Sequence, residues 1–357
     1  MTRILVFRIG HLGDTLLSLP ALRAIRAAHR DASLVLLTNR ETSRATVTAW
    51  DVLEPAGVFD DVLFFPVPSR MSDFVTLARR VRRLKPSRLY YLPPLPRTRA
   101  QTLRDRVFFR VGCGIRDLVG LEPTGPHPVR DAHGGLVRMA KESDRLVDWV
   151  APALPASAID RRATRLEPAA GDRLRADQLL REAGLSGSRL VAIGPGSKSQ
   201  ATQWPIDRYE EVGRRLLRIH PDLRLLVFGA PHERSLAGTL CRAWGASAVN
   251  LAGSVTLSQS AAMLERCLLY VGNDTGTMHL AASVGTPCVA IFSARDNPGR
   301  WEPVGDGHTV LRHEVPCAGC LLSTCVEHDQ ACLKAVSVDD VVEAAAAGLT
   351  AKERVGA

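Results

Sequence analysis

The chain has 357 residues, which is longer than a typical single domain and fits two α/β domains of about 150 residues each. Hydrophobic residues make up 46% and charged residues 23%, and this composition excludes a chain that is disordered throughout. No apolar run approaches the roughly 20 residues that span a bilayer. Arg8 and Asp14 interrupt the apolar N-terminus, so we expect a strand and a turn there rather than a signal peptide, and a cytoplasmic location.

The basic residues are unevenly distributed. The formal net charge is +9, and residues 79–116 hold 12 basic residues against one acid, Asp105. A solvated arginine-rich face would explain this segment, and so would a surface for an anionic membrane or an anionic glycan acceptor. Nucleic acid is not an expected partner, because aromatic residues make up only 5% of the chain and we find no nucleic-acid-binding motif.

The first part of the chain alternates short apolar runs with helical patterns. Strands are predicted at 4–7, 34–37, 61–65 and 88–92, and helices over 19–29 and 74–85. Strands separated by helices form βαβ units, so we expect a parallel sheet in an N-terminal domain of residues 1–165.

A second alternation follows a proline-containing linker, residues 166–187, which carries one predicted helix over about 171–183. The second domain, residues 188–335, has strands predicted at 190–194, 223–229, 248–253, 268–273 and 287–292. Its helices are predicted at 206–219, 232–244, 257–267 and 276–285, and the tail, 336–357, has a helical pattern over 338–349. The predicted fold class is α/β, with two parallel sheets whose carboxyl strand ends face a central cleft.

The sequence FRIGHLGD, residues 7–14, lies where the first strand passes into a helix. Gly10 and Gly13 permit a tight turn, and Asp14 falls at the start of the helix. An aspartate in this position commonly caps a helix. Held at the mouth of a cleft, it can also act as a general base. The spacing alone leaves both interpretations open.

The sequence GPGSKSQATQWP, residues 194–205, joins a predicted strand to a predicted helix. Gly194, Gly196 and Ser197 can present backbone N–H groups, and Lys198 adds a cation. This combination suits a phosphate oxygen. The alternative is an ordinary loop between a strand and a helix.

The sequence VGNDTGTMHLAASVGTP, residues 271–287, is the most specific motif in the chain. Thr275 and Gly276 open a helix directly after Asp274, and the free N–H groups and positive dipole of a helix N-terminus favour a diphosphate. His279 lies one turn further, facing the same end of the helix. The alternative is a capped core helix with a surface histidine.

With these motifs the chain resembles glycosyltransferase family 9, the bacterial heptosyltransferases of lipopolysaccharide core assembly. The opening ILVFRIGHLGDTLLSLPALRAIRAAH resembles the N-terminus of that family, and GNDTGTMHLAASVGTP resembles its donor-site signature. The segments NLAGSVTL and CLKAVSVDDV also fit. The resemblance spans nearly the whole chain and is weakest between about residues 95 and 185.

The resemblance implies a GT-B fold of two Rossmann-like domains and an inverting reaction that requires no divalent metal or other cofactor. It implies a nucleotide-sugar donor, typically ADP-heptose, and a lipid-linked or surface glycan acceptor such as the lipopolysaccharide core. Asp14 would match the catalytic base, and we expect His11 and Gly13 on the acceptor side, in the N-terminal domain.

Glu233, in FGAPHE, would match the acid that contacts the ribose of the donor. The candidates for nucleotide-sugar binding are Gly196, Ser197, Lys198, Glu233, Asp274, Thr275, Gly276 and His279. The family usually carries a lysine two residues before a Trp-Pro pair, whereas this chain has Thr202 there. We therefore expect Lys198, earlier in the same loop, to supply the charge.

Four cysteines cluster in CAGCLLSTCVEHDQACLK, at Cys317, Cys320, Cys325 and Cys332. A CxxC pair followed by two more cysteines has metal-ligand character, and a cytoplasmic location argues against disulfides. Either a structural zinc or iron site or a set of reduced thiols fits this pattern. We expect no catalytic role, because the cluster follows the last predicted core strand.

Other functions fit less well. An NAD-dependent oxidoreductase needs GxGxxG after its first strand, whereas residues 10–13 read GHLG. A nucleotide-sugar epimerase or hydrolase with the same fold needs further acid/base residues, which we do not identify. A nucleotide-sugar-binding protein without transferase activity stays open because of Thr202.

Overall fold

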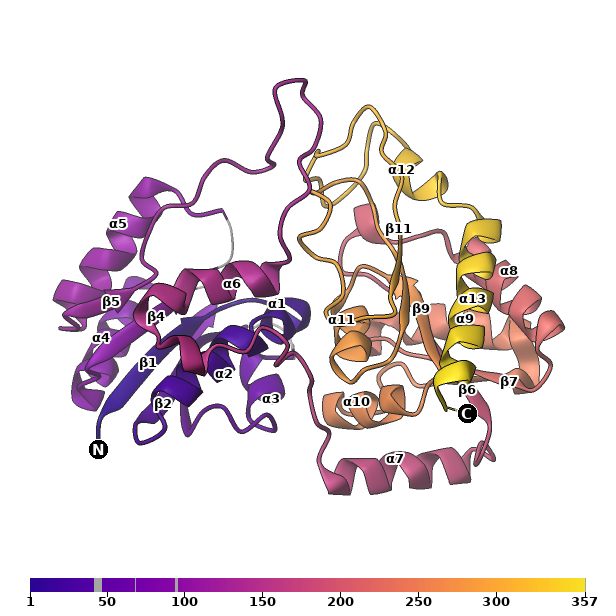
Figure 1. The fold of residues 1–357 in the computed structure, drawn as a ribbon, viewed down its shortest axis with the longest axis horizontal. Helices are drawn as coiled ribbons and strands as arrows, with labels where there is room; N and C mark the ends of the chain where they lie inside the picture. The colour runs from indigo at the N-terminus through magenta and orange to yellow at the C-terminus, as the bar shows by residue number, and fades with distance from the viewer. Residues whose placement is uncertain (42–46, 68, 94–95, 357) are drawn as a thin grey trace. The chain divides into compact units, whose positions relative to one another are not determined.

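The computed structural model describes residues 1–41, 47–67, 69–93 and 96–356. The chain forms two compact units, each built around its own parallel sheet (Figure 1). Unit 1 comprises Met1–His127 and Ala140–Thr164, and unit 2 comprises Pro128–Met139 and Arg165–Ala357. No helix in the described part of the chain is long and apolar enough to cross a bilayer.

Unit 1 has a five-stranded sheet in the order β3-β2-β1-β4-β5. Its strands are β1 (Arg3–Arg8), β2 (Ser33–Glu41), β3 (Asp61–Val67), β4 (Arg88–Leu92) and β5 (Asp117–Val119). Its helices are α1 (Leu12–Leu17), α2 (Leu19–Ala28), α3 (Ala49–Leu53), α4 (Met71–Leu84), α5 (Arg99–Val107) and α6 (Glu142–Val150), and a π-helical turn, Phe108–Gly112, continues α5. Apolar side chains of α4 and of the π turn pack on β1 and β4, where Phe7 and Tyr91 stack with ring centroids 4.7 Å apart.

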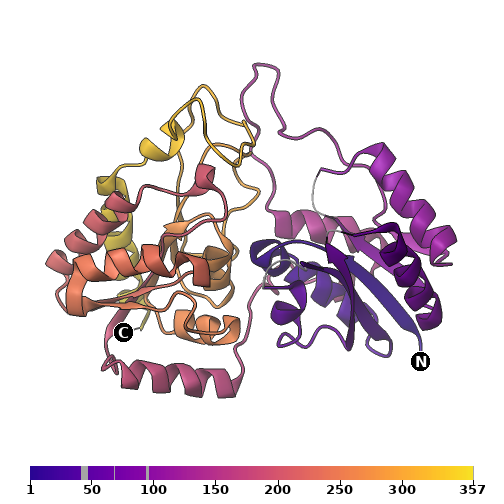
Figure 2. The same cartoon turned by 180° about the vertical axis from the view of Figure 1, so that it is seen from behind.

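Unit 2 has a six-stranded sheet in the order β11-β10-β9-β6-β7-β8. Its strands are β6 (Arg189–Gly194), β7 (Leu223–Val227), β8 (Ala248–Asn250), β9 (Leu269–Asn273), β10 (Cys288–Ile291) and β11 (Thr309–Leu311). Its helices are α7 (Ala170–Glu182), α8 (Ile206–Ile219), α9 (Arg234–Trp244), α10 (Leu257–Glu265), α11 (Gly276–Ser283), α12 (Ala331–Lys334) and α13 (Val338–Gly356). Helices α8, α9 and α13 cover one face of this sheet, and α10 and α11 lie on the other (Figures 1 and 2).

Both sheets confirm the predicted α/β fold class of two Rossmann-like units. Burial on both faces explains why their strands read as continuous apolar runs in the sequence. Two strands were not predicted: β5 and β11 are three residues long, lie at sheet edges and pair with one neighbour each. Strand β8 ends at Asn250, earlier than the predicted 253, so the residues that follow belong to a loop.

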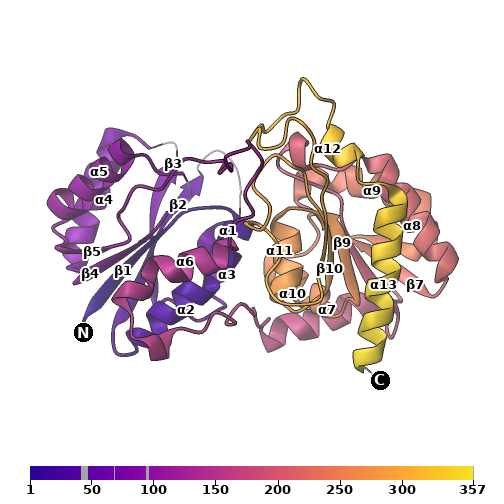
Figure 3. The same cartoon turned by 45° about the horizontal axis from the view of Figure 1, so that its top comes forward.

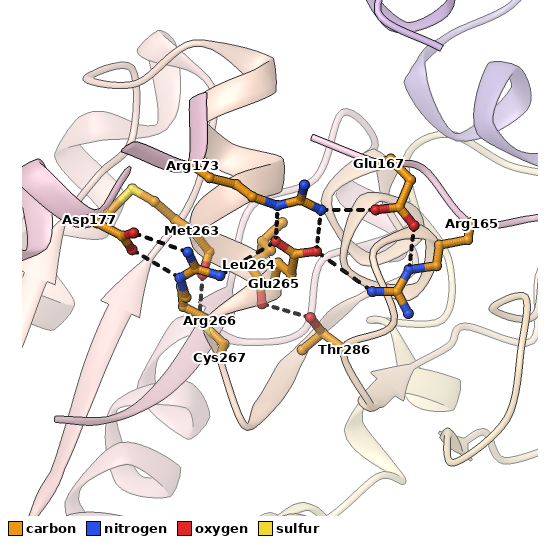
Figure 4. Close-up of polar contacts among 10 residues, drawn as sticks. All are labelled: Arg165, Glu167, Arg173, Asp177, Met263, Leu264, Glu265, Arg266, Cys267 and Thr286. Atoms are coloured by element: carbon orange, nitrogen blue, oxygen red, sulfur yellow. Dashed lines mark hydrogen bonds and ion pairs between the residues drawn. The ribbon is translucent and has the colours of Figure 1, made fainter. Parts of the chain in front are cut away.

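Residues 166–187, expected to be a linker, contain α7 and lie in unit 2. Ion pairs fix this segment (Figure 4). Arg173 of α7 forms a two-pronged pair with Glu265 of α10, at 2.7 and 2.8 Å, and Arg266 pairs with Asp177 at 2.9 and 3.1 Å. Hydrogen bonding from Arg173 holds the pKa of Glu265 below its usual value. The segment is therefore part of a folded unit.

Residues 128–139, expected in the N-terminal domain, also lie in unit 2. The side chain of Asn297 holds them there: its oxygen accepts from the Val129 N–H at 2.9 Å, and its amide donates to the carbonyls of Val129 and Val137 at 2.7 and 2.9 Å. Such a contact depends on a residue about 160 positions away, so the local sequence carries no sign of it.

Candidate functional site

Three neighbouring strands of unit 2 end in the loops that carry the donor-site candidates. Loop 195–205 follows β6, Glu233 lies in the loop after β7, and Asp274 follows β9. The strand order reverses between β6 and β9, because the chain runs outward from β6 to β8 on one side and from β9 to β11 on the other. Ligands of open α/β sheets bind at such a reversal, so the candidates lie where the topology favours a ligand.

Asn273, at the end of β9, holds the loop after β6 in place. Its buried amide donates to the carbonyls of Pro195 and Gly196 at 2.8 and 3.1 Å. Its oxygen accepts from the Trp204 N–H at 3.0 Å and from the Tyr209 hydroxyl at 2.9 Å. The sequence motif contains Asn273 but does not show its role, because its four partners lie more than 60 residues earlier in the chain.

Thr202 is built into the same loop. It is buried, its hydroxyl lies 2.7 Å from the Ser197 hydroxyl, and it donates to the Ser199 carbonyl at 3.0 Å. Lys198, in contrast, is exposed. Within this loop, then, the residue that replaces the family's lysine has a structural role, and Lys198 presents a cation on the surface.

Glu233 lies against the glycines of two loops. Its carboxylate accepts from the Ala230 N–H at 2.7 Å, and a Cβ at Gly196 would collide with it. A Cβ at Gly229 would also approach it too closely. Only glycine at these positions lets the carboxylate lie where the loops after β6 and β7 meet.

Helix α11 begins beside this point. Thr275 is its N-cap residue in extended conformation, and among the described residues its side chain makes no capping hydrogen bond to the helix. The first N–H groups of α11 are therefore not satisfied by this side chain and suit an anionic ligand. Asp274 and Gly276 flank Thr275 and are half-buried.

His279 is buried in α11, with its Nε2 atom 3.8 Å from a carboxylate oxygen of Asp274. The alternative of a surface histidine is wrong. The side chain lies one turn inside the helix and close to the acid at its N-terminus, so the motif brings these two groups together.

Tyr270 of β9 was also missed from the sequence. Its ring lies over Gly194 and Gly272, where a Cβ at either position would collide with the hydroxyl. The hydroxyl is fully buried and, within the described part of the chain, has no hydrogen bond of ordinary geometry. Burial raises the pKa of Tyr270, and the nearby Thr275 side chain offsets part of that shift. The phenol therefore lies beneath the start of α11.

Unit 1 carries Asp14 in the first turn of α1. One carboxylate oxygen accepts from the His11 N–H at 2.9 Å. His11 is the N-cap residue of α1 and Asp14 is the acidic partner three positions later, so Asp14 completes a capping box and is not itself the N-cap considered from the sequence. No described residue pairs with the other oxygen. Gly10 has φ +148°, and a Cβ there would lie 2.6 Å from that of Asp14, so the turn requires glycine. Gly13 is half-buried in α1, and His11 is exposed at its start.

A buried cation lies below this turn. Arg8, at the end of β1, is fully buried and donates to the carbonyl of Asp14 and, at 3.3 Å, to that of Leu92 at the end of β4. Arg8 thus ties the turn to the neighbouring strand. Its position in an apolar run suggested a strand end, and only the fold reveals these partners.

The four clustered cysteines of unit 2 line one small cavity together with His328. The Gln330 N–H donates to the Cys325 sulfur at 3.3 Å, and burial and the neighbouring thiols raise the pKa of Cys317. Among the described residues, however, no group of three or more His, Cys, Asp or Glu side chains is placed to hold a metal ion. The four cysteines therefore line the same cavity, but their sulfurs are not arranged as the ligands of a metal ion.

Comparisons with known proteins identify a family and relatives of this chain. The model of glycosyltransferase family 9 (heptosyltransferase) matches residues 140–330. Lipooligosaccharide heptosyltransferase 2 of Haemophilus influenzae is 27% identical over 138 residues, which cover 37% of this chain and 39% of that protein. The chain therefore spans about two fifths of the length of this relative.

Two solved structures share the fold. The E. coli ADP-heptose lipopolysaccharide heptosyltransferase II has a TM-score of 0.69 and 19% identity, covering 99% of this chain and 100% of that one. A family 9 glycosyltransferase from Veillonella parvula has a TM-score of 0.75 and 20% identity, covering 98% and 97%. At these identities the likeness establishes the GT-B fold alone.

Proposed function

Because the chain belongs to glycosyltransferase family 9, we propose that it transfers a sugar, a heptose from ADP-heptose, to a cell-envelope glycan such as the lipopolysaccharide core. The observation that carries this proposal is the meeting of three loops at the strand-order reversal of unit 2, beside the N-terminus of α11. A nucleoside diphosphate is the ligand that such a site suits best.

Five of the donor-site candidates have a specific role in this proposal. The N–H groups of Gly276 and its successors face the diphosphate, and Lys198 adds a cation that stabilises the charge of the departing ADP. Glu233 accepts hydrogen bonds from the ribose hydroxyls. Asp274 and His279 lie at the heptose end of the donor, while Asn273 and Tyr270 keep the surrounding loops in place.

Asp14 is the proposed base. The acceptor hydroxyl oxygen attacks the anomeric carbon while the bond from that carbon to the diphosphate breaks. The electron pair of the broken bond leaves with ADP, and the hydroxyl proton passes to Asp14. The His11 N–H fixes one carboxylate oxygen, which orients the other, and attack opposite the leaving group inverts the configuration. His11 and Gly13 lie on the acceptor side.

No step of this reaction requires a metal ion or another cofactor. For the cysteine cluster we propose a structural role, with zinc or iron held by Cys317, Cys320, Cys325 and Cys332. Thiolates are suitable ligands, and the four sulfurs line one cavity, although they would have to move to reach tetrahedral positions. The metal would stabilise this part of unit 2 and would not contact the donor.

We place the reaction in the cytoplasm, at the inner face of the membrane, where a lipid-linked acceptor would be presented. The test is turnover: incubation with ADP-heptose and a heptose-deficient lipid-linked core should release ADP and add one heptose to the acceptor, as measured by mass spectrometry. Binding of ADP-heptose without any transfer would instead identify a nucleotide-sugar-binding protein.

A further inference from the structure

Helix α4 exposes a row of apolar side chains. Its inner side chains Leu77 and Val81 are buried against the sheet of unit 1, as expected of an amphipathic helix. Met71, Phe74 and Val75 are nevertheless exposed, and their spacing of three and four residues places them on one face. This face has no partner among the described residues that would bury it.

A second exposed row runs along α5 and the π turn. Leu103, Val107 and Val111 follow one another at intervals of four residues, with exposed fractions of 63%, 52% and 67%. On the inner side of the same segment, Phe109 and Cys113 are buried in the core. Helix α4 and the π turn that continues α5 therefore pack apolar side chains in unit 1, while other apolar side chains of α4, α5 and the turn are exposed.

The two rows lie on neighbouring helices. Phe74 meets Phe108 of the π turn edge to face, with ring centroids 5.9 Å apart, and Arg82 of α4 donates to the Val111 carbonyl at 2.8 Å. Figures 1 and 3 both show α4 and α5 side by side. We call the set Met71, Phe74, Val75, Leu103, Val107 and Val111 the α4–α5 surface. Single exposed apolar residues are common, but clustered ones mark an interaction site.

Exposed arginines share the two segments with the apolar residues of the α4–α5 surface. They are Arg79, Arg80, Arg82, Arg83, Arg99, Arg104, Arg106 and Arg110. The acids nearby are engaged: Asp105 accepts from the Tyr91 hydroxyl at 2.5 Å and pairs with Arg104 at 2.7 Å, and Asp73 accepts from the Arg70 N–H at 2.7 Å. Residues 94–95 of the basic segment lie outside the described residues.

We propose that the α4–α5 surface docks this protein on an anionic lipid bilayer, with the apolar side chains entering the headgroup layer and the arginines pairing with lipid phosphates. Apolar side chains flanked by basic ones are what interfacial helices use to lie on membranes. A second copy of the chain would set two arginine-rich surfaces against each other, which charge repulsion disfavours. The inference does not depend on the donor site, because all of these residues lie in unit 1.

The test compares matched variants of the full chain by co-sedimentation with liposomes. The apolar variant is Met71→Ser/Leu103→Ser/Val111→Ser, and the charge variant is Arg79→Gln/Arg83→Gln/Arg110→Gln. The matched apolar control, Leu174→Ser/Ile219→Ser/Val326→Ser, changes side chains of unit 2 that are more than half exposed. Arg30→Gln/Arg162→Gln/Arg218→Gln changes exposed arginines elsewhere and controls for net charge. Circular dichroism, and calorimetry with ADP, check that each variant is folded.

Wild type is expected to bind vesicles of phosphatidylcholine with 30% phosphatidylglycerol and to keep part of that binding in 0.5 M NaCl, because the apolar contacts are not screened. The apolar variant should partition to the vesicles about 10-fold or more weakly than wild type. It should also lose all of the binding that wild type keeps in 0.5 M NaCl. The charge variant should bind more weakly and with less salt dependence, and both controls should match wild type.

Three results would overturn the inference: equal binding by the apolar variant and wild type, equal binding of wild type to neutral vesicles, and no binding of wild type to either vesicle. Light scattering that shows a dimer broken by the apolar variant would assign the surface to a second copy instead. Wild-type protein that binds anionic vesicles but neither binds ADP nor turns over would count against the proposed transferase function. It would leave the inference about the α4–α5 surface unchanged.

Discussion

The Trp204 N–H donates to the side-chain oxygen of Asn273 at 3.0 Å, so the end of β9 fixes the start of the Trp-Pro turn that leads into α8. The same oxygen accepts from Tyr209, and the amide nitrogen reaches Pro195 and Gly196. One buried side chain thus determines the course of the loop that carries Lys198, the proposed cation for the donor.

Replacing Asn273 with Ala should destabilise unit 2 by about 3 kcal/mol, because it leaves buried hydrogen-bonding groups without partners, each at a cost of about 1–3 kcal/mol. Urea unfolding followed by tryptophan fluorescence measures this loss. Asn250→Ala, at the more accessible end of β8, is the control and should cost much less. Equal losses in the two variants would contradict the role of Asn273 in fixing the loop.

Lys198→Ala should weaken ADP binding about 10-fold, a loss within the usual 1–3 kcal/mol for a hydrogen bond to a charged group. Isothermal titration calorimetry with ADP gives the affinity directly. Lys334→Ala, which removes an exposed lysine paired with Asp329, is the matched control and should bind as wild type does. Unchanged affinity in Lys198→Ala would mean that another cation compensates for Thr202.

The ion pairs between α7 and α10 predict a pH dependence of stability. The pKa of Glu265 is lowered in the folded state, chiefly by hydrogen bonding from Arg173, so the carboxylate stabilises the fold above its unfolded pKa. This stabilisation is lost as the pH falls through the lower, folded pKa. Glu265→Gln should therefore lower the melting temperature by a few degrees at pH 7.

The difference in melting temperature between Glu265→Gln and wild type should narrow below a pH of about 4, where this carboxylate takes up a proton in the unfolded chain. Calorimetric scans of both proteins at pH 7, 5 and 3 measure it. Glu182→Gln, at an exposed pair with Arg175, is the control and should have little effect at any pH. A difference that stays constant with pH would rule out the ion pair as its source.

The cysteine cluster predicts about one zinc or iron per chain after anaerobic purification. Elemental analysis of wild type and of Cys317→Ser/Cys320→Ser tests it, and the double variant should lose both the metal and thermal stability. Cys241→Ser, on α9 and away from the cavity, should keep the metal. Wild-type protein with no metal and four freely titratable thiols at these positions would refute the metal site and leave reduced thiols.

How far the sequence predicts this molecule depends on the range of the interactions. Apolar runs are local, so the strands around β1, β4, β6 and β9 and the parallel sheets follow directly from them. The edge strands β5 and β11 are only three residues long, too short to show an apolar run or a period. The same distinction holds for the candidate site. Motif spacing indicates Asp14 and α11, whereas Tyr270, Asn273 and Arg8 act through partners that only the fold brings near.

Asp14 tests the central claim most directly, because it both accepts the N–H of the N-cap residue of α1 and serves as the proposed base. The side-chain oxygen of Asn can also accept an N–H, so Asp14→Asn can keep the hydrogen bond from the His11 N–H while removing the proton acceptor. We expect a folded protein that binds ADP-heptose as wild type does and turns over about 100-fold more slowly, the usual scale for loss of a general base. Heptose transfer by Asp14→Asn at close to the wild-type rate would contradict the account.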